Sequence, residues 1–305
     1  MANSSLVENN NNDITRVMLW CMPRSASTSF LKCMTYVPDT LAFFEPYSMC
    51  HRYCKDEVIG QTVNDFKQQY MPADITDNDK LQAIEGGYLA TEKGYTWVKE
   101  QLEATPLGKK MIFCKDMIGW PIHEHFERLP SGFQHTFLIR NPYLIFDSLK
   151  KAINRGSPVD KKLQLDDLPP IYMPTGRYFK EQYDLYRYVK DTLGQIPLVV
   201  DTDELLANPA GVMKAYFKAI GVPFSDDYLH WKPGQECMEK LWIVPNELYV
   251  LGNLRRWHGV TFESTGFGSP RKCPDREDLS EDVVHYADSC MEYYEKMYAD
   301  RLKPL

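Results

Sequence analysis

Residues 22–30, with the sequence MPRSASTSF, combine one arginine with four side-chain hydroxyls in a short loop. An apolar run ends before Pro23 and another apolar pattern begins at Phe30, which is typical of a strand, a tight loop and a helix start. A helix N-terminus offers unpaired N–H groups and partial positive charge, and an arginine adds a fixed, bidentate charge. The loop therefore suits a phosphate or a similar anion, and the alternative is an ordinary capped turn. The candidate ligands are Arg24, Ser25, Ser27, Thr28 and Ser29.

A second candidate group lies in FLIRNPYLIFDSLKK, residues 137–151. Arg140 ends an apolar run, and Ser148 follows eight residues later, about two turns into a predicted helix. The guanidinium and the hydroxyl would grip one anion between them, unless they are a surface arginine and a solvent-facing serine. The sequence G-x-x-x-x-G-K-[ST] does not occur, so hydrolysis of a nucleoside triphosphate is a poor fit.

Five short, near-continuous apolar runs predict strands that are covered on both faces. These runs are residues 16–22, 40–45, 110–115, 135–140 and 196–201. Helical patterns occupy residues 27–36, 91–104, 142–153, 176–193, 209–220 and 280–300. The alternation predicts an α/β fold with a central, mostly parallel sheet and helices on both faces.

Polar residues follow four of the predicted strands directly. They are Pro23–Ser29, Glu45–Pro46, Lys115–Asp116 and Arg140–Asn141. In open α/β sheets, ligands bind at the carboxyl ends of the strands, so we expect these groups to share one edge of the sheet.

The composition limits the possible partners. The chain has 305 residues, 44% of them hydrophobic, and a formal net charge of −7, so an anion needs a local basic cluster and general nucleic-acid binding is not expected. The Asn/Ser-rich residues 1–15 predict a disordered tail before a single domain at 16–305, and residues 154–175 resemble an inserted loop or lid.

Targeting and metal signals are also not expected. We predict no membrane span and no signal peptide, and the scattered cysteines fit reduced thiols in a cytoplasmic protein. Cys50, His51 and Cys54 are two ligands short of a structural zinc site, so no metal site is predicted.

Together, PRSASTS and RNPYLIFDS resemble the two nucleotide-binding motifs of the sulfotransferase family, whose phosphate loop usually reads P-[KR]-[ST]-G-[ST]-[ST]. The resemblance implies a P-loop-like α/β fold and a sulfonate donor, 3'-phosphoadenosine 5'-phosphosulfate (PAPS), which leaves as 3'-phosphoadenosine 5'-phosphate (PAP). It implies that residues 24–29 hold the 5' end of the donor, and that Arg140 and Ser148 grip its 3'-phosphate.

Further segments resemble the family in the same order. LAFFEPYS resembles the F-E-P segment of carbohydrate-type members, and residues 197–226 resemble a later acidic and helical stretch. FGSPRKCPD weakly resembles the basic loop that closes over the nucleotide, which implies donor contacts for Arg271 and Lys272. Ala26 replaces the usual glycine, which carries a cost if this position needs a positive φ. The K-T-H triplet of cytosolic members is missing.

Sulfonate transfer needs charge stabilisation and a general base rather than a metal. We assign charge stabilisation to Arg24 and Lys115, and we take Glu45, the glutamate of F-E-P, as the first candidate base, with a salt-bridged glutamate as the alternative. The further candidate bases are Asp116, His51, His123 and His125.

The acceptor is expected to be a hydroxyl or an amine of a small molecule or sugar, and the sequence does not name it. Its pocket would come from residues 46–90, 154–175 and 230–262. Two other readings stay open: a catalytically silent nucleotide-binding or scaffold protein of the same fold, and a small-molecule kinase, which would depend on magnesium.

Overall fold

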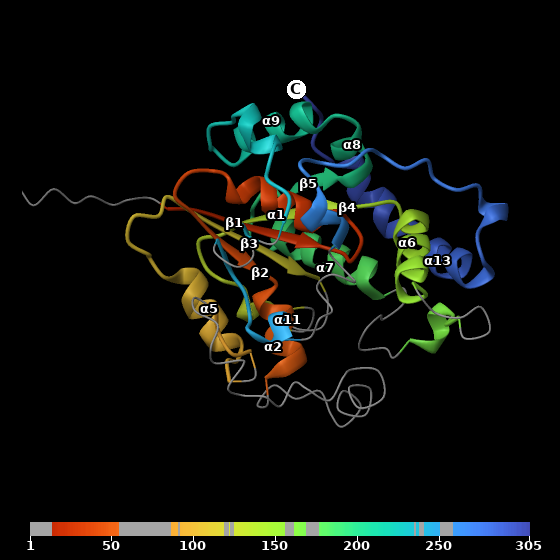
Figure 1. Cartoon of the computed structure of the whole chain (residues 1–305), viewed down its shortest axis with the longest axis horizontal. Coiled ribbons are helices and arrows are strands. Elements are labelled where there is room, and N and C mark those ends of the chain that lie inside the picture. Colours follow the sequence, from red (N-terminus) through yellow and green to blue (C-terminus); the bar gives the residue numbers. More distant parts are fainter. Residues whose placement is uncertain are drawn as a thin grey trace, which may run out of the picture.

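The core of the fold is a six-stranded parallel sheet in the order β5-β4-β1-β3-β2-β6. The strands are β1 (Thr15–Cys21), β2 (Thr40–Phe44), β3 (Met111–Met117), β4 (Gln134–Ile139), β5 (Leu198–Asp201) and β6 (Trp242–Ile243) (Figure 1). This computed structural model describes residues 14–54, 87–90, 92–118, 122, 125–155, 162–168, 177–234, 236–237, 241–250 and 259–305.

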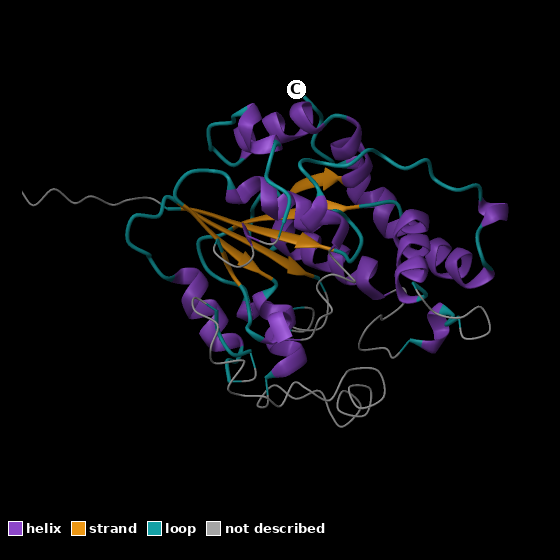
Figure 2. Ribbon diagram, in the orientation of Figure 1, coloured by secondary structure: helices purple, strands orange, loops and turns teal. Residues whose placement is uncertain are grey.

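Helices cover both faces of the sheet, as Figure 2 shows. One face carries α1 (Ser27–Thr35), α8 (Thr202–Ala207) and α9 (Pro209–Ala219). The other carries α5 (Tyr95–Glu103), α6 (Pro142–Ile153), α7 (Arg177–Asp191) and α13 (Glu281–Ala299). Shorter elements are α2 (Pro46–Tyr53), α11 (Glu247–Val250), η2 (Phe126–Arg128), η4 (Leu165–Asp167), η5 (Asp226–Leu229) and η6 (Arg276–Asp278).

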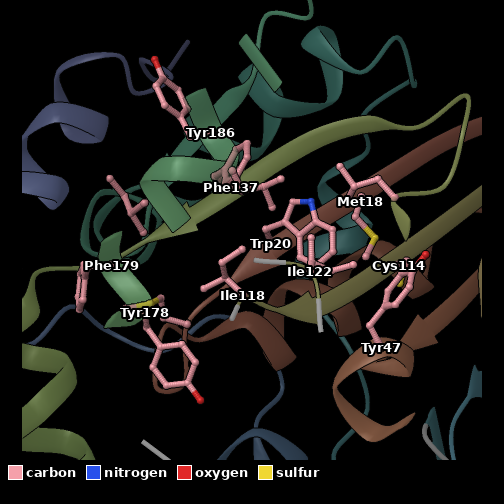
Figure 3. Packing of buried hydrophobic residues seen from close by; sticks show 14 of the residues in the cluster. Met18, Trp20, Tyr47, Cys114, Ile118, Ile122, Phe137, Tyr178, Phe179 and Tyr186 are labelled. Carbon is pink, nitrogen blue, oxygen red and sulfur yellow. The ribbon is translucent and has the colours of Figure 1, made fainter. Parts of the chain in front are cut away.

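The burial of the central strand β1 on both faces explains why the predicted strands are continuous apolar runs in the sequence. Val17 and Leu19 of β1 pack with the α1 face, whereas Met18 and Trp20 pack with the opposite face, and all four side chains are fully buried. Figure 3 shows Trp20 among the side chains of Ile118, Ile122 and other buried residues on the face opposite α1. A strand without a solvent face cannot show a polar alternation.

The predicted fold class is confirmed. Each of the five predicted strands and six predicted helices has a counterpart, with shifts at the ends such as the start of α5 at Tyr95 instead of residue 91. The structure adds β6, which has only two residues, and the short helices α2 and α8, which are not among the predicted elements.

The strand order places two of the polar loops at a switch point. The connection after β1 leads through α1 to β2 on one side, whereas the connection after β4 leads through α6 and α7 to β5 on the other side. Since β1 and β4 are neighbours, the loops that follow them diverge from a common crevice, where such sheets bind ligands.

In the part of the chain that the structure describes, no helix is long and apolar enough to cross a membrane.

The fold buries a titratable side chain, His135 of β4, against the central strand β1. Trp20 Nε1 donates a hydrogen bond to His135 Nδ1 at 3.1 Å, so the imidazole has to stay neutral at this atom. Burial lowers the pKa of His135 from 6.5 to about 4. A histidine with a lowered pKa contributes stability that is present above pH 6.5 and is lost as the pH falls toward 4.

We therefore expect the unfolding free energy of the wild type to fall by up to about 3 kcal/mol between pH 6.5 and 4, relative to a His135→Gln variant whose amide oxygen accepts the same bond. Urea denaturation of both proteins at pH 7.0 and 4.5 measures this difference. The comparison is needed because burial raises the pKa of Asp201 to about 6, which gives the opposite pH dependence in the same window. An unfolding free-energy difference between the two proteins that does not change with pH would contradict the assignment.

Candidate active site

The loop between β1 and α1 has an unusual backbone. Arg24 and Ala26 adopt left-handed conformations, with φ values of 67° and 57°. Position 26 thus has the positive φ that glycine adopts freely, and an L-residue there carries a strain of about 1–2 kcal/mol. The expected cost of alanine in place of the family's glycine is present in this loop.

The start of α1 has no side-chain cap. The N-cap residue Ala26 makes no side-chain hydrogen bond, whereas Asn141, Asp201 and Asn208 cap α6, α8 and α9. The first-turn N–H groups of a helix have no intrahelical carbonyl partners, and the N-cap residue of α1 offers them no side-chain acceptor. This N-terminus is therefore the one among these four helices that suits an external anion.

The hydroxyl residues of the loop are all buried, but they do not serve one purpose. Ser25 Oγ donates a hydrogen bond to Met22 O at 2.7 Å, and Ser25 O accepts one from Thr202 Oγ1 at 2.9 Å. The Ser25 hydroxyl therefore holds the loop together. Ser27, Thr28 and Ser29 begin α1, and their side chains are 5–8% exposed.

The two predicted phosphate motifs meet in space. Arg24 Nε donates a hydrogen bond to Ser148 Oγ at 3.2 Å, and Arg140 donates from a terminal nitrogen to Arg24 O at 2.8 Å. Arg140 also pairs with the carboxylate of Asp203 at 3.3 Å. Residues more than 110 positions apart thus form one continuous contact at the ends of β1 and β4.

Positive charge gathers around this contact. Burial lowers the pKa of Arg24, and the guanidinium groups of Arg155, Arg271 and Arg140 lower it further. Three further arginines thus lie close enough for their charges to act on Arg24, and a concentration of positive charge of this kind favours a multiply charged anion. The residues present therefore fit the two phosphate ends of a nucleotide such as PAP.

The positions of two basic residues differ from what the sequence analysis expected at the candidate donor site. Arg155, which lies two residues beyond the end of α6 and whose charge acts on Arg24, was missed because no sequence motif marks it. Lys272, which was expected beside the nucleotide, is strongly exposed and its ammonium lies 3.6 Å from the carboxylate of Asp275. Arg271 is thus the member of this pair whose charge acts on Arg24.

The candidate catalytic residues Glu45 and Lys115 form a buried ion pair. Phe44 pairs with Lys115 across β2 and β3, and Glu45, with a left-handed φ of 51°, turns the chain so that its carboxylate meets the Lys115 ammonium. Burial by itself lowers the pKa of Lys115, but Cys21 and Glu45 offset this and raise the pKa above its ordinary value. Lys115 is therefore a cation at neutral pH.

The ion pair lies on the same face of the sheet as the phosphate loop. The Cys21 thiol is hydrogen-bonded to the side chain of Ser27, and the charges of Lys115 and Glu45 affect its pKa, which burial raises to about 11. The Cys21 thiol thus lies between the first residue of α1 and the ion pair, whose lysine is on the neighbouring strand β3.

The second candidate base, Asp116, has a structural role. Its carboxylate accepts hydrogen bonds from Tyr47 N at 2.6 Å, from Ser48 N at 3.1 Å and from the Ser48 hydroxyl at 2.6 Å, so it caps the N-terminus of α2. Burial raises its pKa to about 7, while these donors and Met117 N lower the pKa. The sequence analysis missed this role because the cap comes from a residue about 70 positions away.

The candidate histidines lie apart from the phosphate motifs or outside the described residues. His51 Nδ1 shares a hydrogen bond of 2.6 Å with the Tyr95 hydroxyl inside the core, and His125 pairs with Glu127 at the surface. His123 lies outside the described residues. Within the described chain, no group of three or more His, Cys, Asp and Glu side chains could hold a metal ion.

Two curated proteins of Arabidopsis thaliana are similar to this chain. Branched-chain-amino-acid aminotransferase-like protein 2 is 29% identical over 282 residues, which are 90% of this chain and 40% of that protein. Branched-chain-amino-acid aminotransferase-like protein 1 is 29% identical over 172 residues, which are 56% of this chain and 26% of that protein. The chain therefore spans less than half the length of these relatives.

Among solved structures, the sulfotransferase domain from the curacin biosynthetic pathway is 11% identical, with a TM-score of 0.43 over 91% of this chain and 98% of that one. Residues 179–301 match the family model described as the sulfotransferase domain. The matched segment begins in α7 and ends after α13, so it does not include the two phosphate motifs. This match shows that the α7 to α13 part of the chain is similar to the sulfotransferase domain, the family that the sequence analysis indicated from other segments.

Proposed function

We propose that this protein transfers the sulfonate of PAPS to a hydroxyl or amine of a small-molecule or sugar acceptor. The observation that carries the proposal is the contact of Arg24 with Ser148 and of Arg140 with the Arg24 carbonyl, beside the uncapped start of α1. This arrangement offers two anion-binding ends at the carboxyl edge of one sheet, as a nucleotide with both a 3'-phosphate and a 5'-phosphosulfate requires.

In this proposal, the first turn of α1 and Arg24 hold the 5' end of the donor, and Arg140 with Ser148 holds its 3'-phosphate. The bound donor supplies a sulfonate group on a phosphate leaving group. Arg155 and Arg271 add positive charge around the same anions, because both already act on Arg24. Binding of the anions would relieve the repulsion within the arginine cluster.

Glu45 and Lys115 have complementary roles in the proposed transfer. The acceptor oxygen or nitrogen forms a bond to sulfur, the bond from sulfur to the phosphate oxygen breaks, and the acceptor proton passes to the Glu45 carboxylate. A carboxylate that is paired with an ammonium is a weak base. The proposal therefore requires Lys115 to turn from Glu45 toward the negatively charged oxygens of the transferring group, which frees Glu45 to accept the proton.

Donor binding can be tested by calorimetry without magnesium. We expect PAP to bind with micromolar affinity, ATP to bind more weakly, and Arg140→Ala to weaken PAP binding by about 10- to 100-fold, because a charge-assisted contact is lost. Arg187→Ala is the matched control, since this exposed arginine pairs with Asp191 on α7. Failure of the wild type to bind PAP, or a loss of thermal stability in Arg140→Ala that accounts for its weaker binding, would overturn the assignment.

The role of Arg155 can be tested separately. Because Arg155 is exposed and lies two residues beyond the end of α6, its charge should add about 1 kcal/mol to PAP binding at low salt, so we expect Arg155→Ala to raise Kd about fivefold. The effect should shrink at high ionic strength. An unchanged Kd at low salt would remove Arg155 from the donor site.

The catalytic role of Glu45 can be separated from binding. We expect Glu45→Gln to keep PAP affinity within about twofold but to lower sulfonate transfer by about 10²- to 10⁴-fold, which is the usual contribution of a general base. The measurement is transfer from radiolabelled PAPS to a panel of phenols, alcohols, amines and sugars.

Because Glu45→Gln leaves Lys115 without its charged partner, thermal melting of this variant and of Glu45→Gln/Lys115→Met shows whether the fold survives. Full activity in a folded Glu45→Gln protein would refute the base. Tight PAP binding by a wild type that transfers to no acceptor would favour the catalytically silent reading.

A further inference from the structure

We propose that Lys32, near the end of α1, is a positioning residue for Arg271, because it anchors the chain segment from which Arg271 reaches the donor site. The inference rests on the proposed function, in which Arg271 meets a phosphate of the donor. Lys32 itself touches neither the arginine cluster nor the Glu45–Lys115 pair in the described contacts.

Lys32 is fully buried, which is unusual for a lysine without a carboxylate among its described partners. Its ammonium donates hydrogen bonds to Thr261 O at 3.2 Å and to Lys232 O at 3.4 Å, and it lies 5.8 Å from the centre of the Trp231 ring. Burying an ammonium is costly unless it is hydrogen-bonded, so these contacts are needed to keep the charge inside. They connect α1 to two segments that follow it by 200 and 229 residues.

The two anchored segments are also bonded to each other. Trp231 N donates to Thr265 O at 3.0 Å, and Trp231 Nε1 donates to Ser264 Oγ at 3.0 Å. The Ser264 hydroxyl in turn donates to Thr261 O at 2.7 Å, the carbonyl that Lys32 also contacts. The ring of Phe267 packs edge-on against Trp231 at 5.3 Å. Residues 261–267 are therefore fixed onto α1 through Lys32 and Trp231.

This anchor limits where Arg271 can lie. Arg271 follows Phe267 by four residues, which span at most about 13–14 Å when extended. On the far side, Arg276 is held by the carboxylate of Asp288 on α13. Residues 268–275 thus cross the molecule between two anchors, in the blue loop that precedes α13 in Figure 1.

One rigid helix therefore connects the two sides of the donor site. The loop with Arg24 stands at the start of α1, and Lys32 fixes the base of the Arg271 segment near its end. The charge of Arg271 already acts on Arg24 across this arrangement. If the Lys32 contacts are lost, Arg271 keeps its charge but loses the fixed base that aims it at the anion.

The inference is tested by a double-mutant cycle on PAP affinity with Lys32→Met, Arg271→Ala and the double variant. We expect Arg271→Ala to weaken binding about tenfold, Lys32→Met about fivefold, and the double variant no more than Arg271→Ala alone, because Lys32 acts through Arg271. At saturating donor, turnover by Lys32→Met should match the wild type, while the donor KM rises. Lys214→Met, on the exposed side of α9, is the matched control.

A second readout does not depend on the donor. Hydrogen exchange of the ligand-free protein should show faster exchange at the Trp231 and Gly234 amides, which bond to the carbonyls of Thr265 and Phe262, in Lys32→Met than in the wild type. If Lys32→Met does not fold, Ser264→Ala, which removes two hydrogen bonds of the same anchor, takes its place in both experiments.

The outcomes separate this inference from the proposed function. A wild type that does not bind PAP overturns the proposed function and this inference with it. A wild type that binds PAP, combined with additive effects of Lys32→Met and Arg271→Ala, overturns the positioning role alone. Unchanged exchange at Trp231 and Gly234 would show that Lys32 does not anchor the segment.

Discussion

The hydrogen bond from the Arg140 guanidinium to the Arg24 carbonyl is the interaction on which the candidate site depends. It joins the ends of two neighbouring parallel strands at the point where their connections diverge, and the Arg24–Ser148 bond extends it to α6. Because the carbonyl of Arg24 accepts this bond within a left-handed stretch of backbone, the contact also supports the strained turn that leads into α1. Loop geometry and anion binding are thus parts of one arrangement.

The candidate site combines a strained backbone turn with a concentration of positive charge. A left-handed turn leads into α1, whose N-cap residue provides no side-chain cap, and the charges of three other arginines act unfavourably on Arg24. Asp203 is the acidic partner of Arg140, and it is held in place by α8, whose start is capped by Asp201. The protein folds with unfavourable terms that a bound anion would offset, which is how a site becomes selective for a highly charged ligand.

The sequence was sufficient for the features that depend on local pattern. Strands buried on both faces, such as β1, appear as apolar runs, and proline after asparagine marked the starts of α6 and α9. Ala26 could be suspected of strain because its place in the turn was recognisable. Features that depend on long-range contacts could not be predicted in this way. Asp116 caps a helix about 70 residues distant, and Lys32 bonds to carbonyls more than 190 residues away. A buried lysine in an amphipathic helix looks like any surface lysine until the fold places it.

The Glu45–Lys115 pair shows why the site cannot be understood from its residue types alone. A glutamate at the end of a strand is a good candidate base, and a nearby lysine is a good candidate for neutralising a sulfonate, but in the fold each holds the other. The pair stabilises the charged form of Lys115, and in general a carboxylate that is held by an ammonium is a weak base. The Glu45 carboxylate would become a stronger base only if the Lys115 ammonium paired with another anion. In the proposed mechanism, the arrival of a negatively charged donor at the arginine cluster would prepare the base, so that Glu45 would accept a proton only when there is a group to transfer.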